Sequence, residues 1–177
     1  RMNPARGLSA AEWLARVERG ALAEVLRVDS DEPFAEELAD ALTGEHVRAR
    51  PVRTTRALAA AVREALAERA TEEELDLSVR RVFQALRIEV NDEFGALERL
   101  LQQLPDGLRP GGRAVFLTFH SGEDRRVKRH FERGLAAGVY SALSDGVLRA
   151  SAEERRANPR SSSAKLRWAE RSDARDP

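Results

Sequence analysis

The strongest constraint on the fold is a single apolar strand in a chain that otherwise predicts helices. Residues 113–119, RAVFLTF, follow the turn-forming stretch PDGLRPGG and form a nearly continuous apolar run. Such a run is typical of a strand buried on both faces of a parallel sheet. The chain offers one or two further strands at most, and a lone two-stranded ribbon is marginal in water. We therefore expect part of this sheet to be missing or to be supplied by another chain.

Helical periodicity dominates the beginning of the sequence. The segment LSAAEWLARVERGALAEVL (8–26) has Ser9 and Glu12 at capping-box spacing, and its apolar residues recur every three or four positions. This pattern predicts one helix.

Two more helices are predicted before residue 76. SDEPFAEELADALTG places Phe34, Leu38 and Leu42 on one face, with an end at Gly44. TTRALAAAVREALAER is a third helix, capped by Thr54 or Thr55.

The second half mixes helices with strands. Residues 77–104 are helical by periodicity, with a bend or break expected near 91–95, where polar residues precede a glycine. A further helix is expected over about 123–137. Residues 151–163 predict a loop, and the following AKLRWAE alternates as in a half-buried strand.

Composition and charge exclude several classes of protein. The 177 residues include no cysteine, which excludes disulfides and thiolate metal sites, and no apolar run approaches membrane-spanning length. The zero net charge hides an asymmetry, because residues 109–177 carry 15 Lys or Arg against 9 Asp or Glu. A basic C-terminal third can bind phosphates, but on charge alone ordinary solvated surface is the simpler interpretation.

The end of the apolar strand carries chemically active side chains. His120, Ser121, Glu123 and Asp124 follow it directly, and an Arg- and Lys-rich helix comes next. In open α/β sheets, the carboxyl ends of strands face the ligand crevice. A structural interpretation also stands, with Ser121 as an N-cap and two acids in the first helical turn. That interpretation leaves His120 and the basic helix face unassigned.

The stretch FQALRIEVNDEF shows a second polar cluster. Gln84, Arg87 and Asn91 are spaced to share one helical face, which is either functional or simply solvated. Asn91 and the following Asp92 are poor residues for a helix interior. Phosphate-binding glycine motifs, nucleophile elbows and credible metal-ligand spacings are absent from the sequence, so no metal is expected.

Three segments, in order, resemble one family. RVFQALRIEVNDEFGALERLL, LRPGGRAVFLTFHSGEDRRVKRHF and NPRSSSAKLRWAER are similar to the C-terminal half of the bacterial 16S ribosomal RNA cytosine-N4 methyltransferases, the MraW-like family. RMNPARGLSAAEWL and PVRTTRALAAAVREAL resemble parts of that family's inserted helical domain.

The resemblance implies a fold and an activity. The fold class is α/β and helix-rich, namely the C-terminal part of a Rossmann-like methyltransferase sheet plus an inserted helical domain. The activity is transfer of a methyl group from S-adenosylmethionine to the N4 amine of a cytidine in 16S ribosomal RNA of the small ribosomal subunit. The expected parts are the helical insertion (1–76), the C-terminal part of the methyltransferase domain (77–171) and a disordered tail (172–177).

The resemblance also suggests roles for individual residues. His120, Asn91 and Glu93 are the expected catalytic residues, with His120 in a proton role and Asn91 orienting the amine. The expected RNA contacts are Arg87, Arg125, Lys128, Arg129, Lys165 and Arg167. The glycine-rich loop and the acids that hold the cofactor are expected upstream of this chain, so the chain alone is expected to be inactive. A cytoplasmic protein that does not enter membranes is expected, with a homodimer as an open alternative to a monomer.

Several positions depart from the family pattern. Leu77 and Ser78 replace a usual His-Pro, and Gly122 replaces a usual Leu. Acids stand at 36 and 37 instead of a basic pair, and Ser162 replaces a common Arg. These changes leave open a second function, a non-catalytic RNA-binding or ribosome-assembly module derived from the same fold.

Overall fold

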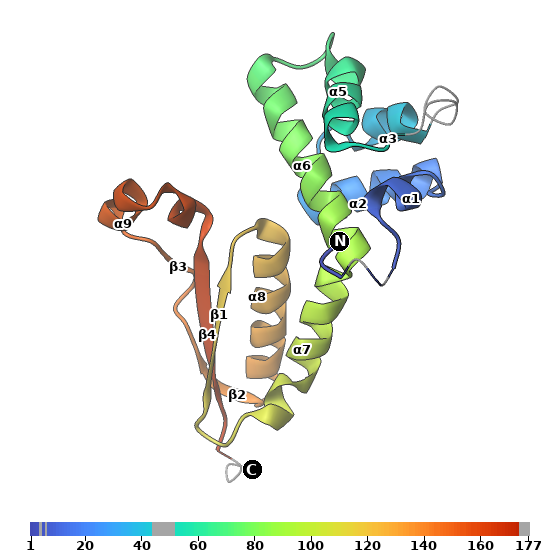
Figure 1. Cartoon of the computed structure of the whole chain (residues 1–177). Coiled ribbons are helices and arrows are strands. Elements are labelled where there is room, and N and C mark those ends of the chain that lie inside the picture. Colours follow the sequence, from blue (N-terminus) through green and yellow to red (C-terminus); the bar gives the residue numbers. More distant parts are fainter. Residues whose placement is uncertain (4, 6, 44–51, 174–177) are drawn as a thin grey trace. The chain divides into compact units, whose positions relative to one another are not determined.

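The computed structural model describes residues 1–3, 5, 7–43 and 52–173, which form two compact units. The first is Arg1–Glu93 and the second begins at Phe94 (Figure 1). Across these described ranges, no helix combines the length and apolarity needed to traverse a lipid bilayer.

We call the first unit the helical unit, because its described residues fold mainly as helices. Its helices are α1 (Ala10–Leu14), α2 (Arg19–Ser30), α3 (Ala35–Thr43), α5 (Thr55–Leu66) and α6 (Glu72–Asn91). One face of each helix contributes to a shared apolar core, in which Leu22, Leu38 and Val62 are fully buried. The core positions predicted at Leu38 and Leu42 of α3 are thereby confirmed.

The predicted single helix over 8–26 is wrong. Ser9 and Glu12 do form the capping box, but α1 ends at Leu14, and Glu18 is extended before α2 begins. The buried residues Leu14 and Leu22 are eight positions apart, which also suits one continuous helix. Because neither glycine nor proline marks the break, the apolar pattern conceals it.

Helix starts elsewhere follow the predicted chemistry. Thr54 caps α5 by accepting a hydrogen bond from the backbone N–H of Ala57. Thr71 and Glu74 form a capping box that starts α6 before the predicted position 77. The predicted helix end at Gly44 lies outside the described residues.

The predicted break near 91–95 is confirmed. Helix α6 ends at Asn91, Asp92 adopts a left-handed conformation (φ 49°), and α7 (Glu93–Gly107) starts directly afterwards. Asp tolerates this backbone region better than most residues, which explains its position at the junction. Helix α6 runs without interruption through residue 76, and the contacts between residues divide the chain into two units after Glu93. The boundary expected at 76/77 concerns the family's inserted domain and stays a prediction.

The second unit, which we call the sheet unit, combines helices with a small sheet. Its remaining elements are β1 (Arg113–Thr118), α8 (Ser121–Ala136), β2 (Tyr140–Leu143), β3 (Leu148–Arg149), α9 (Ala152–Ala157), a 3-10 helix η1 (Pro159–Ser163) and β4 (Lys165–Arg171). Helices α7 and α8 lie on one side of the sheet (Figure 1). Residues 151–163, predicted as a loop, are therefore partly helical.

The central strand is β4, which confirms AKLRWAE as a strand. It pairs antiparallel with β1 on one edge and with β2 and β3 on the other. The expectation of a parallel sheet is thus wrong for the described part of the chain. Within that part, β1 has one strand neighbour, and its other edge is unpaired.

The two faces of the sheet differ in cover. Phe116 packs against Phe131 of α8 with ring centroids 5.7 Å apart, and Tyr140 of β2 is buried against the same helix. On the opposite face, Val115 is 60% exposed and Leu117 is 56% exposed. The expected burial on both faces of the strand is therefore wrong for this chain, because its helices cover one face.

The expected disordered tail, 172–177, lies largely outside the described residues. Only Ser172 and Asp173 are described, and Ser172 donates a backbone hydrogen bond to Val139.

Candidate functional site at the carboxyl end of strand β1

The strand end is shaped by the start of helix α8. His120 is the N-cap, with extended backbone, and its Nδ1 accepts a hydrogen bond from Glu123 N–H at 3.4 Å. The carboxylate of Glu123 in turn accepts a hydrogen bond from the backbone N–H of Phe119 at 3.0 Å. Ser121 is the first helical residue, so its predicted capping role is wrong: the imidazole occupies that position.

The other nitrogen of His120 makes no hydrogen bond within the described residues. This nitrogen, Nε2, is buried, and Glu123 Oε1 lies 3.4 Å away. Because Nδ1 accepts a hydrogen bond, this geometry assigns the proton of the neutral ring to Nε2. His120 is therefore set up to donate a hydrogen bond, and buried groups left without partners are often functional.

Glu123 is held as a carboxylate beside this ring. Burial raises the pKa of Glu123, but the contact with His120 and the hydrogen bond from Phe119 N–H outweigh it and leave that pKa below its ordinary value. The site therefore places a negative charge next to an imidazole at neutral pH.

An aromatic side chain supports the His120 ring from α7. Phe94 lies with its ring centroid 5.6 Å from that of His120. A Cβ at Gly122 would come within 2.5 Å of Phe94 Cζ, so the missing side chain makes room for this ring. The guanidinium of Arg126 stacks over the Phe94 ring, with its central carbon 3.4 Å from the ring centroid. The departure at Gly122 thus has a steric explanation.

The second acid of the motif ties α8 to the central strand. Asp124 is 8% exposed and accepts two hydrogen bonds from Arg167, at 2.7 and 3.1 Å. Lys165 Nζ lies 3.8 Å from the same carboxylate. Burial raises the pKa of Asp124, but the hydrogen bonds and charge of Arg167, with the charge of Lys165, outweigh it and lower that pKa.

The structure brings other predicted residues together in the first unit. Arg87 donates two hydrogen bonds to the carboxylate of Glu93, at 2.9 and 3.0 Å. Asn91 donates to the carbonyl of Arg87 at 2.7 Å and accepts from the backbone N–H of Met2 at 2.6 Å. The predicted catalytic residues are therefore divided, with Asn91 and Glu93 in the first unit and His120 in the second.

The predicted RNA contacts differ in how far they are engaged. Arg167 and Lys165 hold Asp124, as described, and Lys128 forms an exposed ion pair with Glu132 at 3.6 Å. Arg129 is exposed on α8 and forms no ion pair or hydrogen bond with the described residues. Its role, like the others, stays a prediction.

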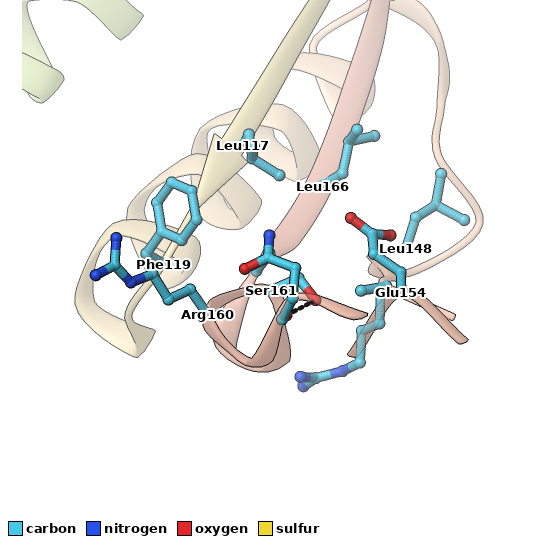
Figure 2. Close-up of a pocket in the computed structure, with 11 residues that line it drawn as sticks. Leu117, Phe119, Leu148, Glu154, Arg160, Ser161 and Leu166 are labelled. Carbon is cyan, nitrogen blue, oxygen red and sulfur yellow. Dashed lines mark hydrogen bonds between the residues drawn. The ribbon is translucent and has the colours of Figure 1, made fainter. Parts of the chain in front are cut away.

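Sequence reasoning missed a pocket beside the strand end. It has a volume of about 420 Å³ and an apolar floor that includes Leu117, Phe119 and Leu166. Figure 2 shows Arg160, Ser161 and Glu154 around the same cavity. An apolar floor with a few polar groups suits a small organic ligand. The signal was present in the NPRSSS stretch, which folds as η1, but its position over Phe119 depends on the tertiary fold.

The described residues do not fit as a complete cofactor cradle. The paired glycines of this unit, Gly111 and Gly112, precede β1 and so lie at the end opposite His120. Ligands in open α/β sheets bind at the carboxyl ends of strands. Across the described ranges, no group of three or more His, Asp or Glu side chains is arranged to hold a metal ion.

Comparisons with known proteins give one consistent result. A model of the MraW methylase family matches residues 1–172. The chain is 45% identical over 172 residues to ribosomal RNA small subunit methyltransferase H 1 of Lachnoclostridium phytofermentans, a match that covers 96% of this chain and 47% of that protein. It is 44% identical over 176 residues to the protein of the same name from Agathobacter rectalis, covering 98% of this chain and 50% of the relative.

A third relative extends the comparison to another group of bacteria. Ribosomal RNA small subunit methyltransferase H of Acidothermus cellulolyticus is 42% identical over 185 residues, which cover 97% of this chain and 56% of that protein. The chain thus spans about half the length of the curated relatives it matches.

Proposed function

The chain belongs to the MraW methylase family, and on that premise we propose that it takes part in methylation of small-subunit ribosomal RNA in the cytoplasm. The reaction is transfer of a methyl group to the N4 amine of a cytidine in 16S ribosomal RNA. The observation that carries the proposal is the family match over residues 1–172, which includes the strand end at His120. S-adenosylmethionine would supply the methyl group, held mainly by residues outside this chain.

The chain's own residues supply substrate handling. A cytosine amine is a weak nucleophile, so the site must chiefly position the base and exclude competing orientations. The Nε2–H of His120 makes no hydrogen bond within the described residues and suits donation to an acceptor atom of the base, which refines the expected proton role toward orientation. Phe94 and Gly122 keep the imidazole in place.

Asn91 and Glu93 are proposed to act near the same base. Asn91 is held at both ends of its amide, which fixes its direction. Glu93 accepts two hydrogen bonds from the Arg87 guanidinium, so this pair suits electrostatic support beside the base. Lys165 and Arg167 are proposed to contact RNA through positive charge that Asp124 compensates only in part.

Nucleoside analysis tests the proposal. The coding region of this chain is deleted from its organism, and 16S ribosomal RNA is digested and examined by mass spectrometry. We expect N4-methylcytidine to disappear, to return with the wild-type gene, and to stay absent with H120A. The variant E64Q, on the exposed side of α5, is the control that restores it. Unchanged N4-methylcytidine in the deletion strain would contradict the proposal.

A second candidate is a non-catalytic RNA-binding or ribosome-assembly module. The departures from the family pattern at Leu77, Ser78, Gly122 and Ser162 favour it. In the same experiment, this candidate predicts an unchanged N4-methylcytidine content together with a defect in small-subunit assembly, which sucrose-gradient profiles of ribosomal particles detect.

A further inference from the structure

A basic groove runs between α7 and α8, away from the strand end. It has a volume of about 370 Å³ and is lined by six polar side chains and by Leu101. The polar side chains are Glu98 and Gln102 from α7 and Arg126, Arg129, His130 and Arg133 from α8. We call this the α7–α8 groove.

The charges in this groove are unbalanced. Glu98 accepts a hydrogen bond from Arg126 at 2.9 Å, so these two side chains neutralise each other. The side chains of Arg129 and Arg133 are exposed and form no ion pair or hydrogen bond within the part of the chain that the structure describes. The groove therefore presents two uncompensated guanidinium groups, which makes it a site for anions.

The wall of the groove packs closely against strand β2. His130 Nε2 lies 2.9 Å from the hydroxyl of Tyr140, and Tyr140 is 1% exposed. A Cβ at Gly134 would come within 2.4 Å of the Tyr140 ring, so α8 approaches β2 closely here. Burial lowers the pKa of His130, so the ring is neutral at physiological pH and the positive charge of the groove comes from arginine.

The spacing of the arginines suits a polyanion. Arg129 and Arg133 are four residues apart on α8, which places them about 6 Å apart along the helix axis on one face. A guanidinium binds phosphate through two parallel hydrogen bonds, and the Gln102 amide offers further donors. His120 lies on the same helix, about 14 Å from Arg129 along the axis.

We propose that the α7–α8 groove holds backbone phosphates of the RNA strand whose base is presented at His120. The inference rests on the proposed function and adds Arg133 and the α7 side of the groove to the substrate surface. Arginine forks at this spacing match consecutive negative charges on one strand, and the groove carries no exposed aromatic anchor of the kind that dominates protein interfaces.

Salt-dependent RNA binding tests this groove. The wild-type chain and R129A/R133A are titrated into a fluorescein-labelled single-stranded RNA of 16S sequence, and anisotropy is followed at several salt concentrations. The matched control, R56A/R80A, removes two exposed arginines from the helical unit. We expect the groove variant to bind roughly tenfold more weakly and the slope of log affinity against log salt to shrink by about 1.4.

The control and a second variant separate the outcomes. R56A/R80A should bind within about twofold of wild type with an unchanged slope, and thermal unfolding should show that all proteins are folded. R129K/R133K, which keeps the charge but loses the fork, should fall between wild type and the alanine variant. Equal losses of RNA affinity in the groove and control variants, or no loss in either, would overturn the proposed phosphate site in the groove and leave the proposed function intact. Wild-type protein that fails to bind the RNA overturns both.

Discussion

The helical unit and the sheet unit close their cores to different degrees. In the helical unit, apolar residues from α1, α2, α3, α5 and α6 bury one another, and Leu22, Leu26 and Leu38 have no exposed surface. The sheet unit buries one face of its sheet against α8 but leaves Val115 and Leu117 more than half exposed. The first unit therefore has the core of a self-sufficient domain, and the second has an apolar face that can bind another element.

The two units also use arginine differently. In the helical unit, Arg19 and Arg27 both bind Glu36, and Arg69 binds Glu37. The acids at 36 and 37, which depart from the family's basic pair, are thus engaged in ion pairs. In the sheet unit, Arg129 and Arg133 have no partner among the described residues. The acids of α3 thus neutralise neighbouring arginines, whereas Arg129 and Arg133 of α8 are available for ligands.

The largest expected effect tests the closed core. Leu26→Ala removes a fully buried side chain from the helical unit and should lower the free energy of unfolding by about 3 kcal/mol. Chemical denaturation followed by circular dichroism measures the change. The control Val28→Ala, on the same helix and 39% exposed, should cost less than about 0.5 kcal/mol. A similar small cost for both would show that this core is not closed.

The next effect tests the aromatic support of His120. Gly122→Leu drives a side chain into Phe94 and should cost about 2 kcal/mol, because overpacking displaces the ring. Phe94→Ala in the same protein should recover part of that loss, which a double-mutant cycle quantifies. Gly20→Ala on α2, where nothing lies within 4 Å of the new Cβ, should instead stabilise by about 0.5–1 kcal/mol. Additive effects of the Gly122 and Phe94 substitutions would contradict the contact.

A third prediction concerns the ion pair between α8 and β4. Asp124→Asn leaves Arg167 half-buried without its charge partner and should cost about 2 kcal/mol, less than the cost for a fully buried pair. Because folding lowers the pKa of Asp124, the carboxylate stabilises the fold above its ordinary pKa near 4, and this contribution is lost as pH falls through the lower folded value.

Denaturation at several pH values checks this sign. The gap in stability between wild type and Asp124→Asn should be full at neutral pH and close in acid. Glu132→Gln, which breaks the exposed pair with Lys128, should change stability by less than about 0.5 kcal/mol at any pH. A gap that is independent of pH would argue against the charge as its source.

The smallest stability effect is expected on the open sheet face. Val115→Thr with Leu117→Thr should cost less than about 1 kcal/mol in total, because both side chains are already largely exposed. Size-exclusion chromatography of the same variants distinguishes the homodimer from the monomer alternative: a wild-type dimer that becomes monomeric would place its interface on this face. A large loss of stability in a monomeric chain would contradict the open face.

Local sequence signals predicted much of the fold. The capping box at Ser9, the cap at Thr54 and the break near Asp92 were visible because each depends on residues within a few positions. The break between α1 and α2 was not visible, since the apolar spacing runs through it. Strand β2 was missed because four residues carry too little periodicity.

The candidate site was less accessible to sequence reasoning. The position of His120 at a strand end followed from the pattern, and its capping contact with Glu123 N–H is local. The pairing of Asp124 with Arg167 joins residues that are 43 positions apart. The fit between Gly122 and Phe94 likewise needs the placement of α7 beside α8. Side chains that meet only through tertiary structure leave no short-range signal.

The central claim is that this chain supplies substrate handling and not the cofactor cradle. Isothermal titration calorimetry of S-adenosylmethionine into the 177-residue chain tests it most directly. We predict no measurable heat of binding, because the cofactor residues are proposed to lie outside the chain. Saturable binding at micromolar concentration would contradict the claim, and loss of that binding in Phe119→Ala would then locate the cofactor in the pocket beside strand β1.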